Sequence, residues 1–494
     1  MMIKKQLSRI LSITLLCALG LYSCAGDEGE VVLETSGEET TTDAASEYTK
    51  PELDCGGETF TIASYNFDMG YAVCNYTMIS HDEEDGDIIN DSIIDMTRRV
   101  EDDFNVRLEL MELGINDRTS TENFTKSIYA GEDLYQAGFP VTACLRLLLS
   151  EPSLLCDLSS IATLDLERSW WDQNSVAEYD IGGRQYTVSG DICFFAKSAP
   201  VVNFVNKQML EDYSLDDPYQ LVRDGRWTLD KMKEMAAAAS HDLNGNGEVD
   251  VDDSFGFMNE PSSVSYFMIG FGIDYSTRGS DDSIELSFYS DRAATAIEKL
   301  VPFMRDKTTT LYAQDYMADY SNDPYGLLFQ PTFMSNRALF YSNQLLLALD
   351  FRGMDADFGI LPLPKLDESQ PEYCSTTNIA WCDNLIVPAT NTDLERTGYI
   401  LEAMGYYSQQ LVTPAFIETT VLGKSLRDED SAEMIELIYS TQVYDIALMF
   451  DWGGIANMLK GLANSESTNL ASEYAKYESQ IAAAMEKTMS EFGR

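Results

Sequence analysis

The stretch "GDIINDSIIDMTRRVEDDFNVRLELMEL" (residues 86–113) contains the periodicity that decides the fold class. In its first half, apolar residues recur every three or four positions, at Ile89, Ile93, Met96 and Val100. In its second half, they alternate with polar residues, at Val106, Leu108 and Leu110. The first spacing predicts an amphipathic helix, and the second predicts a strand that follows it directly.

The segment before this stretch predicts another strand. In "GGETFTIASYNF" (residues 56–67), Phe60, Ile62 and Tyr65 are the apolar residues that suggest it. Strand, helix and strand in this order are typical of an α/β lobe. The sequence therefore predicts an α/β protein whose ordered part begins near residue 55.

Later segments extend the same alternation of helices and strands. "WTLDKMKEMAAAA" (residues 227–239) predicts a helix with Thr228 as N-cap and Asp230 in the first turn. "DFGILPLPK" (residues 357–365) predicts a strand stopped by its two prolines. Further helices are predicted in three segments: residues 391–410, 428–440 and 471–492.

Length, composition and charge limit the function classes. The chain has 494 residues and is 45% hydrophobic, so two lobes or domains with sizeable cores are expected. Its net charge is -49. Nucleic acids and anionic membrane surfaces require basic patches, so this excess of acid argues against both as direct partners.

The first residues predict export. A basic start, with Lys4, Lys5 and Arg9, precedes a short apolar run that ends at "LYSC". This arrangement resembles a bacterial lipoprotein signal, which implies that residues 1–23 are removed and that Cys24 is lipidated. The alternative is an ordinary cysteine after a normal cleavage site. The acidic, Ser/Thr-rich residues 24–54 predict a disordered tether, which would anchor the protein to the extracellular face of a bacterial membrane.

The remaining cysteines carry little information. Cys17 and Cys24 belong to the signal, and seven others follow it. An odd number leaves at least one without an intramolecular disulfide partner. The sequence contains no CxxC pair, which disfavours a zinc site, and the disulfide pairing is left open.

One local motif predicts a metal site. In "HDLNGNGEVDVDDSFGF" (residues 241–257), oxygen donors fall at the offsets of an EF-hand loop, with Glu248 contributing its backbone carbonyl. The predicted ligands are Asp242, Asn244, Asn246, Glu248, Asp250 and Asp253. Asp253 stands where EF-hands carry glutamate, as it does in dockerin-type loops. We expect one structural Ca²⁺; the alternative is an Asn-Gly turn that binds no metal.

No catalytic motif accompanies this loop. The chain has two histidines, His81 and His241, and neither lies beside a nucleophile motif. Sequences of the GxSxG and HExxH types are absent, and "LGKS" (residues 422–425) lacks the first glycine of a phosphate-binding loop. The protein is therefore not expected to be an enzyme. A carboxylate pair stays possible, so a secreted glycoside hydrolase with a dockerin-like loop is the alternative.

Several stretches together, in one order along the chain, resemble a known family. They include "GDIINDSIIDMTRRVEDDFNV", "SWWDQNS", "GGRQYTVSGD", "VNFVNKQML", "RWTLDKMKEMA", "NRALFYSNQLLLAL", "FGILPLPK", "NLIVPATNTDLERTGYILEAM", "GKSLRDEDSAEMIELI" and "FDWGG". This set resembles the extracellular solute-binding proteins of ATP-driven (ABC) importers, in family 1, which includes maltose-binding protein. It covers nearly the whole predicted mature chain.

The resemblance implies a two-lobe periplasmic-binding-protein fold of type II, with the ligand cleft between lobes joined by crossing segments. The crossings would be "APVVNFVNK" and "CSTTNIAWC". Lobe one would comprise residues 55–200 plus 376–411, and lobe two residues 201–375 plus 412–494. A monomer that delivers its ligand to an ABC permease by hinge closure is implied. A ligand-binding module that serves a sensor is a further alternative.

Candidate ligand contacts lie at predicted strand ends and crossings, where aromatic faces and planar polar groups suit sugars. They are Tyr65, Asn66, Asp68, Asp191, Tyr341, Asn343, Trp381, Asp451 and Trp452. Each of the aromatic residues has an alternative role in core packing. The abundance of aromatic residues favours a carbohydrate or oligosaccharide ligand, while a peptide or another small polar solute stays open.

Overall fold

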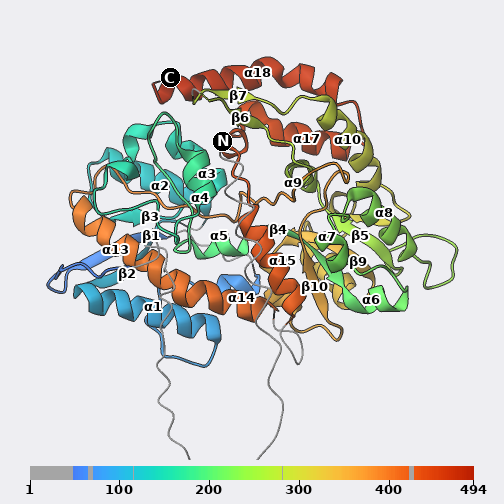
Figure 1. Cartoon of the computed structure of the whole chain (residues 1–494), viewed down its shortest axis with the longest axis horizontal. Helices are drawn as coiled ribbons and strands as arrows, with labels where there is room; N and C mark the ends of the chain where they lie inside the picture. The colour runs from blue at the N-terminus through green and yellow to red at the C-terminus, as the bar shows by residue number, and fades with distance from the viewer. Residues whose placement is uncertain (1–47, 65–69, 115, 281, 422–427, 494) are drawn as a thin grey trace, which may run out of the picture. The chain divides into compact units, whose positions relative to one another are not determined.

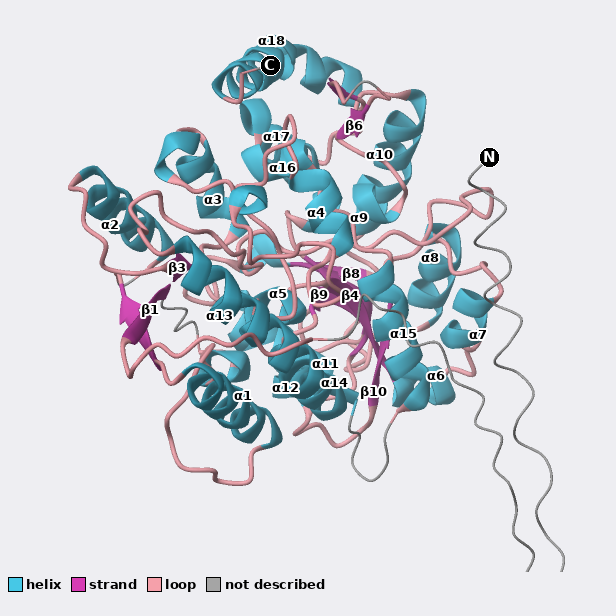
Figure 2. Cartoon of the chain, turned by 60° about the vertical axis from the view of Figure 1, so that its left-hand side comes forward, coloured by secondary structure: helices cyan, strands magenta, loops and turns pink. Residues whose placement is uncertain are grey.

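The structure is a computed structural model that describes residues 48–64, 70–114, 116–280, 282–421 and 428–493. These residues all fall in one compact unit, and residues 1–47 lie outside the described part. Three sheets occur among the described residues, with helices packed around them (Figures 1 and 2). The predicted signal, lipidation site and most of the predicted tether therefore lie outside the described residues.

The first sheet is parallel and has the strand order β2-β1-β3. Its strands are β1 (Thr59–Ser64), β2 (Arg107–Glu112) and β3 (Ala137–Gly138). Helix α1 (Ile88–Phe104) connects β1 to β2, as a parallel pair requires. The predicted order of strand, helix and strand is confirmed.

Local chemistry fixes both ends of α1. The Asp87 carboxylate accepts hydrogen bonds from the backbone N–H groups of Ile89 and Asn90, both at 3.0 Å, and so caps the first turn. Asn105 ends the helix in the left-handed conformation, with φ 46°. The four residues whose spacing predicted the helix are all buried, so the predicted face is the one that packs into the core.

The second sheet has five strands in the order β10-β4-β9-β5-β8. They are β4 (Val201–Asn206), β5 (Phe255–Asn259), β8 (Thr310–Tyr312), β9 (Ala338–Gln344) and β10 (Phe358–Leu361). Strand β4 pairs antiparallel with β9 and β10, while β5 pairs parallel with β8 and β9. All six residues of β4 are buried, including the polar residues Asn203 and Asn206.

Helix α8 (Leu229–Ala238) lies directly against β5. The Thr228 side chain caps α8 by accepting from the Lys231 N–H, as predicted from the sequence. Gly256 permits the close approach, because a Cβ there would lie 2.1 Å from the Ala236 carbonyl oxygen. This contact fixes the start of β5, and the candidate site lies beyond the opposite end of the strand.

The other helices surround these sheets, with α18 beside α10 and α17 in Figure 1. They are α2 (Asp117–Tyr129), α3 (Thr142–Leu149), α4 (Gln173–Tyr179), α5 (Phe194–Ser198), α6 (Lys207–Asp212), α7 (Pro218–Arg223), α9 (Ser263–Gly270), α10 (Asp291–Met304), α11 (Gln330–Met334), α12 (Leu347–Phe351), α13 (Leu394–Tyr407), α14 (Thr413–Val421), α15 (Glu429–Ser440), α16 (Ile446–Phe450), α17 (Ile455–Asn464) and α18 (Leu470–Glu491). Strands β6 (Ser276–Arg278) and β7 (Ile284–Leu286) form an antiparallel hairpin.

The two predicted crossings lie side by side. The Val201 N–H donates to the Thr376 carbonyl at 2.8 Å, and the Asn378 N–H donates to the Ala199 carbonyl at 3.0 Å. A third segment joins them, since Ser375 pairs in parallel with Gln442. Three chain segments therefore run together at this point.

In the C-terminal part of the chain, helices from the two predicted lobes pack against one another. Helix α13 packs on α1, which agrees with the place of residues 376–411 in predicted lobe one. Helix α14, predicted to belong to lobe two, contacts both α1 and α12. The division into lobes stays a prediction.

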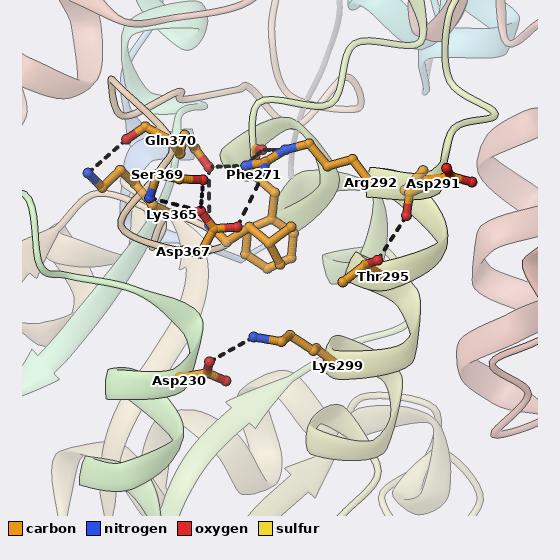
Figure 3. A network of polar contacts seen from close by, with 12 residues as sticks. Asp230, Phe271, Asp291, Arg292, Thr295, Lys299, Lys365, Asp367, Ser369 and Gln370 are labelled. Atoms are coloured by element: carbon orange, nitrogen blue, oxygen red, sulfur yellow. Dashed lines mark hydrogen bonds and ion pairs between the residues drawn. The ribbon is translucent and has the colours of Figure 1, made fainter.

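A polar network secures the loop that leads from β10 back to the crossings (Figure 3). The Gln370 side chain accepts from Arg292 Nη2 at 3.0 Å and donates to the Gly270 carbonyl at 2.9 Å. Lys365, which is 3% exposed, donates from Nζ to the Gln370 carbonyl at 3.0 Å. Because these polar groups have hydrogen-bond partners within the protein, they fix the path of the loop.

Candidate ligand-binding site

A cluster of polar aromatic residues surrounds one carboxylate, and we call it the Glu260 cluster. Its members are Tyr71, Glu260, Tyr325, Tyr341 and Asn343. Glu260 comes directly after β5, and Tyr341 and Asn343 belong to the neighbouring strand β9. Tyr325 begins the π-helical turn η6 (Tyr325–Phe329), and Tyr71 directly precedes the short helix η2 (Ala72–Asn75).

Hydrogen bonds orient the polar groups of this cluster. The Tyr325 hydroxyl donates to Glu260 Oε2 at 3.2 Å, and Asn343 Nδ2 donates to the Tyr341 hydroxyl oxygen at 2.6 Å. The Glu260 N–H donates to Ser263 Oγ at 3.2 Å, at the start of α9. Glu260 is therefore held through both its backbone N–H and its side-chain carboxylate.

Burial sets the protonation of the cluster. It raises the pKa of Glu260, while Lys460 and the hydrogen bond from Tyr325 lower that pKa. Burial, followed by the negative charges of Asp323, Asp350 and Glu260, raises the pKa of Tyr71 to about 12. The hydroxyl of Tyr71 is therefore protonated at neutral pH and can both donate and accept hydrogen bonds.

Trp381 adds an aromatic ring from the crossing segment. It forms an edge-to-face pair with Tyr71, with ring centroids 5.6 Å apart and planes at 74°. The Ala72 N–H, next in the chain, donates to Asp350 Oδ1 of α12 at 3.2 Å. The cluster thus combines residues that precede and residues that follow the 199–201 crossing.

Several of these side chains are open to solvent. Tyr71, Glu260, Tyr325 and Asn343 are partly exposed, whereas Tyr341 is 1% and Trp381 8% exposed. The arrangement offers ring surfaces together with hydroxyl, amide and carboxylate groups. Such a combination can pack against the C–H faces of a sugar ring and bind its hydroxyls.

Of the residues predicted from the sequence, Tyr341, Asn343 and Trp381 contribute to this neighbourhood. Tyr65, Asn66 and Asp68 lie outside the described residues, directly after the last residue of β1. Nothing in the structure tests any of these six as ligand contacts, so their roles stay predictions.

Asp191 has a different environment. It is 7% exposed, and its carboxylate accepts from Thr413 Oγ1 at 2.7 Å and lies 3.3 Å from Lys197 Nζ. Gln409 Nε2 donates to its second oxygen at 3.3 Å. Both oxygens have partners within the protein, so Asp191 ties the segment before the first crossing to the residues around α14.

Asp451 and Trp452 also make internal contacts. Asp451, in the left-handed conformation with φ 47°, pairs with Arg146 Nη1 at 3.0 Å. Trp452 is 1% exposed, and its Nε1 donates to Thr488 Oγ1 of α18 at 3.0 Å. In this arrangement the indole packs in the core and presents no face to solvent.

The sequence analysis missed Glu260, Tyr71 and Tyr325. Glu260 had a usable signal, because it is the first carboxylate after the apolar strand "FGFMN", and ligands of α/β proteins bind beyond strand ends. Tyr71 precedes the short helix η2 and Tyr325 begins the π-helical turn η6, and neither element has a periodic apolar pattern that the sequence reveals. Only the fold brings these two residues to the carboxylate.

The predicted metal loop, residues 242–253, is folded back on itself between α8 and β5. An antiparallel bridge between His241 and Ser254 closes its base. Asp242 accepts hydrogen bonds from the N–H groups of Gly245 and Gly247, at 2.7 and 2.8 Å. The loop therefore has a defined shape around its acidic side chains.

The predicted ligand side chains approach one another inside this loop. Asn244 and Asn246 donate from Nδ2 to the Asp250 carboxylate, at 3.2 and 2.8 Å, and Asp253 accepts from the Asp250 N–H at 2.9 Å. Within the described ranges, no group of three His, Cys, Asp or Glu side chains is placed to hold a metal ion. Three of the six predicted Ca²⁺ ligands are not carboxylates, because Asn244 and Asn246 would bind through amide oxygens and Glu248 through its backbone carbonyl. The full set of six predicted oxygen donors is therefore not tested by this finding.

Comparison with solved structures identifies the architecture. The cyclic α-maltosyl-1,6-maltose binding protein from Arthrobacter globiformis matches with a TM-score of 0.56 at 13% identity, over 87% of this chain and 99% of that one. The chain has the fold of the ABC substrate-binding proteins. This α/β, periplasmic-binding-protein-like fold is the one that the resemblance implied.

Other structures match over a similar extent. The substrate-binding protein Lmo0181 from Listeria monocytogenes, solved in complex with cycloalternan, has a TM-score of 0.53 at 14% identity, over 88% of this chain and 99% of that one. UgpB from Mycobacterium tuberculosis, in complex with glycerophosphocholine, has a TM-score of 0.57 at 17% identity, over 80% and 95%. Neither a protein-family model nor a curated protein matches the chain.

Proposed function

We propose that this protein is the substrate-binding component of an ABC importer and captures a carbohydrate, most favourably an oligosaccharide. The observation that carries the proposal is the Glu260 cluster, in which partly exposed tyrosines surround a hydrogen-bonded carboxylate. The fold supports it, because that fold is shared by Lmo0181, which was solved in complex with cycloalternan, and by the cyclic α-maltosyl-1,6-maltose binding protein from Arthrobacter globiformis.

The charges around the cluster narrow the ligand class. Glu260, Asp323 and Asp350 all act on the pKa of Tyr71, and each raises it. Lys460 is the cation that acts on Glu260. A ligand carrying carboxylate or phosphate groups would meet mainly negative charge here. The proposed ligand is therefore a neutral sugar.

The crossings suggest how capture would proceed. The segments around Ala199 and Thr376 are paired by backbone hydrogen bonds, and φ/ψ changes in them would rotate one predicted lobe against the other. Tyr71 and Trp381 lie on one side of this connection in the predicted lobe division, and Glu260 and Tyr325 on the other. A ligand that contacts both sides would favour the closed arrangement, which a permease could recognise.

In this proposal the chain binds and releases its ligand without chemical change, and ATP hydrolysis belongs to the importer. Lipidation of Cys24 would hold the protein at the extracellular face of the membrane. Within the described residues, no helix has the length and apolar character that spanning a bilayer requires. The same proposal includes a structural Ca²⁺ in the loop 242–253, bound by the predicted oxygen donors.

Thermal melting of residues 25–494 with a panel of neutral oligosaccharides tests the proposal. A ligand that binds only the native state must raise the melting temperature, by an amount that grows with its concentration relative to Kd. We expect one class of oligosaccharide to do so. The matched control is Tyr289→Phe, which removes an exposed hydroxyl from a ring that stacks on Tyr474 and should leave the shift unchanged.

The outcomes separate the alternatives. If no sugar shifts the melt while a peptide does, the carbohydrate class is wrong and the binding function holds. If shortened sugars accumulate during the incubation, the protein is a glycoside hydrolase. A binding protein that serves a sensor would shift its melting temperature but fail to stimulate the ATPase of a reconstituted importer.

A further inference from the structure

One face of helix α17 lies beside the strand ends at which the Glu260 cluster begins. Tyr312, the last residue of β8, pairs in register with Asn259, the last residue of β5. The Tyr312 hydroxyl donates to Asn464 Oδ1 of α17 at 2.8 Å. Helix α17 also packs on α9, whose first residue, Ser263, accepts from the Glu260 N–H. These contacts place α17 next to Glu260.

A buried cation fixes α17 in this place. Arg305, whose side chain is 8% exposed, pairs through Nη2 with Asp315 at 3.0 Å and with Glu466 at 3.1 Å. Its guanidinium also lies over the Tyr312 ring, 4.1 Å from the centroid. Arg305 therefore joins β8 to the residues that follow α17. The helix face that contacts Tyr312 has a defined position relative to the end of β5.

Lys460 belongs to this face of α17. It lies one turn before Asn464, at the i, i+4 spacing that makes two residues neighbours on a helix surface. Its side chain is partly exposed. Burial raises the pKa of Glu260, and the positive charge of Lys460 lowers it. The ammonium of Lys460 is therefore close enough to act on the Glu260 carboxylate.

The ammonium and the carboxylate nevertheless do not pair. Their separation exceeds the 4.0 Å of an ion pair, and Lys460 Nζ donates to no residue in the described ranges. Glu260 Oε2 accepts from the Tyr325 hydroxyl, whereas Oε1 accepts from no described residue. An ammonium and a carboxylate oxygen of the same neighbourhood are thus both available to a ligand.

A sugar offers the groups that such a separated pair can bind. A carboxylate only accepts hydrogen bonds, an ammonium only donates them, and a hydroxyl does both. Of two hydroxyls on adjacent ring carbons, one can donate to Glu260 Oε1 while its neighbour accepts from Lys460 Nζ. Hydrogen bonds to charged groups are stronger than neutral ones, so an analogue that lacks either hydroxyl should bind poorly.

We propose that Lys460 is a specificity-determining residue of the Glu260 cluster, which together with Glu260 selects sugars that carry two adjacent free hydroxyls on one ring. This inference rests on the proposed function, because it concerns the same site. It adds the hydroxyl arrangement that the site recognises and a residue from α17 that recognises it. A sugar ring linked to its neighbour through either of these hydroxyls would be bound weakly.

Calorimetry of residues 25–494 tests the role of Lys460. The probe is whichever of maltotetraose, cellotetraose, xylotetraose and mannotetraose binds the parent protein most tightly. Lys460→Met removes the charge and keeps an unbranched side chain with a similar helix propensity. We expect it to weaken binding tenfold or more without changing the melting temperature of the unliganded protein, and Lys460→Arg to weaken binding less.

Monodeoxy derivatives of the same sugar identify the two hydroxyls. In the parent protein, removal of either of two adjacent hydroxyls should weaken binding tenfold or more. In Lys460→Met one of these two losses should disappear, and in Glu260→Gln the other. A purely structural role of Lys460 would instead weaken the binding of every derivative by the same factor.

The control variant is Lys487→Met, which removes an exposed cation from α18 and should change neither affinity nor specificity. If the parent protein binds a sugar and Lys460→Met binds it equally well, the inference is wrong and the proposed function stands. The same conclusion follows if the two variants affect one and the same hydroxyl, or hydroxyls that are not adjacent. If none of the four sugars binds the parent protein, the proposed function fails, and this inference fails with it.

Discussion

The Glu260 cluster and the loop 242–253 are both built from carboxylates and polar side chains, but they are assembled in opposite ways. The loop takes all its groups from twelve consecutive residues, held by hydrogen bonds within the loop. The cluster takes its members from positions as far apart as Tyr71 and Asn343, which only the two sheets and the crossings bring together. One site depends on local sequence, and the other depends on the whole fold.

This difference predicts that the two sites respond differently to damage elsewhere. Loss of core packing should disrupt the cluster, since its members have no local structure to hold them. The same loss should affect the loop less, because a hydrogen-bonded loop closed at His241 and Ser254 keeps its own geometry.

The largest effect is expected from Tyr341→Ala. Tyr341 is 1% exposed and packs against Phe329, Phe333 and Phe351. Removal of a buried aromatic side chain typically costs about 3–5 kcal/mol. We expect a loss of that size in the free energy of unfolding, measured by urea denaturation, together with loss of the sugar-induced melting shift.

Tyr341→Phe is the control for packing. It keeps the ring and removes only the oxygen that accepts from Asn343, so a loss of about 1 kcal/mol is expected. If the alanine variant were as stable as the phenylalanine variant, the cluster would not depend on this part of the core.

Removal of calcium should have the next largest effect. If the loop binds Ca²⁺, a chelator should lower the melting temperature. When the free Ca²⁺ concentration before chelation is 100 times the Kd, the free energy of unfolding should fall by about 2.7 kcal/mol. The effect of the chelator should vanish in Asp250→Ala, which loses a predicted ligand. It should persist in Asp252→Asn, whose side chain occupies no ligand position.

Sugar binding should survive chelation, because no ligand residue of the Glu260 cluster lies in the loop. Identical melting curves with and without chelator would show that the loop is a turn that needs no metal. Loss of sugar binding on chelation would instead show that the sugar site depends on the loop 242–253.

Tyr325→Phe should have a smaller effect, confined to the cluster. The substitution keeps the ring and removes the hydroxyl that donates to Glu260 Oε2 at 3.2 Å. A hydrogen bond to a charged group contributes about 1.5–3 kcal/mol, and part of that is recovered when water or the ligand takes its place. We expect sugar affinity to fall about tenfold or less by calorimetry, with no change in the effect of the chelator.

The smallest expected effects concern pH, and they have opposite signs at the two sites. Burial raises the pKa of Glu260 above 4.5, so the folded state binds its proton more tightly than the unfolded state does. The stability that this group contributes is present below pH 4.5 and is lost as pH rises through the folded-state pKa. Glu260→Gln should therefore gain stability relative to the parent protein as pH rises.

Asp250 behaves in the opposite way. Hydrogen bonds, first from the Asp252 N–H and then from Asn246, lower its pKa below 3.8. Its stabilising contribution is present above pH 3.8 and is lost as pH falls through the folded-state pKa. Melting curves between pH 3 and pH 8 should show the parent protein losing its advantage over Asp250→Asn in acid. Parallel curves for both variants would contradict this account.

The same comparison explains what the sequence could predict. The order of strand, helix and strand around α1 was readable, because Ile89, Ile93 and Val100 repeat at the helical period and all three are buried. The spacing of the EF-hand-like motif is equally local, and calcium binding by that loop stays a prediction. In both cases the information lies within one short segment.

The Glu260 cluster could be predicted only in part. Tyr341, Asn343 and Trp381 were selected from their places near a strand end and a crossing. Trp452 was selected in the same way, but it packs beneath α18 with Nε1 bound to Thr488. A sequence position near a crossing does not reveal which way a ring points, because the packing of a distant helix decides that.

The most direct test of the central claim is the affinity of the identified sugar for the parent protein and for Glu260→Gln, measured by calorimetry. Loss of a charged hydrogen-bonding partner, at about 1.5–3 kcal/mol, predicts a weakening of about tenfold or more. The variant should melt normally without ligand near pH 5. Unchanged affinity in a normally folded variant would show that the ligand binds elsewhere and that the Glu260 cluster is not the site.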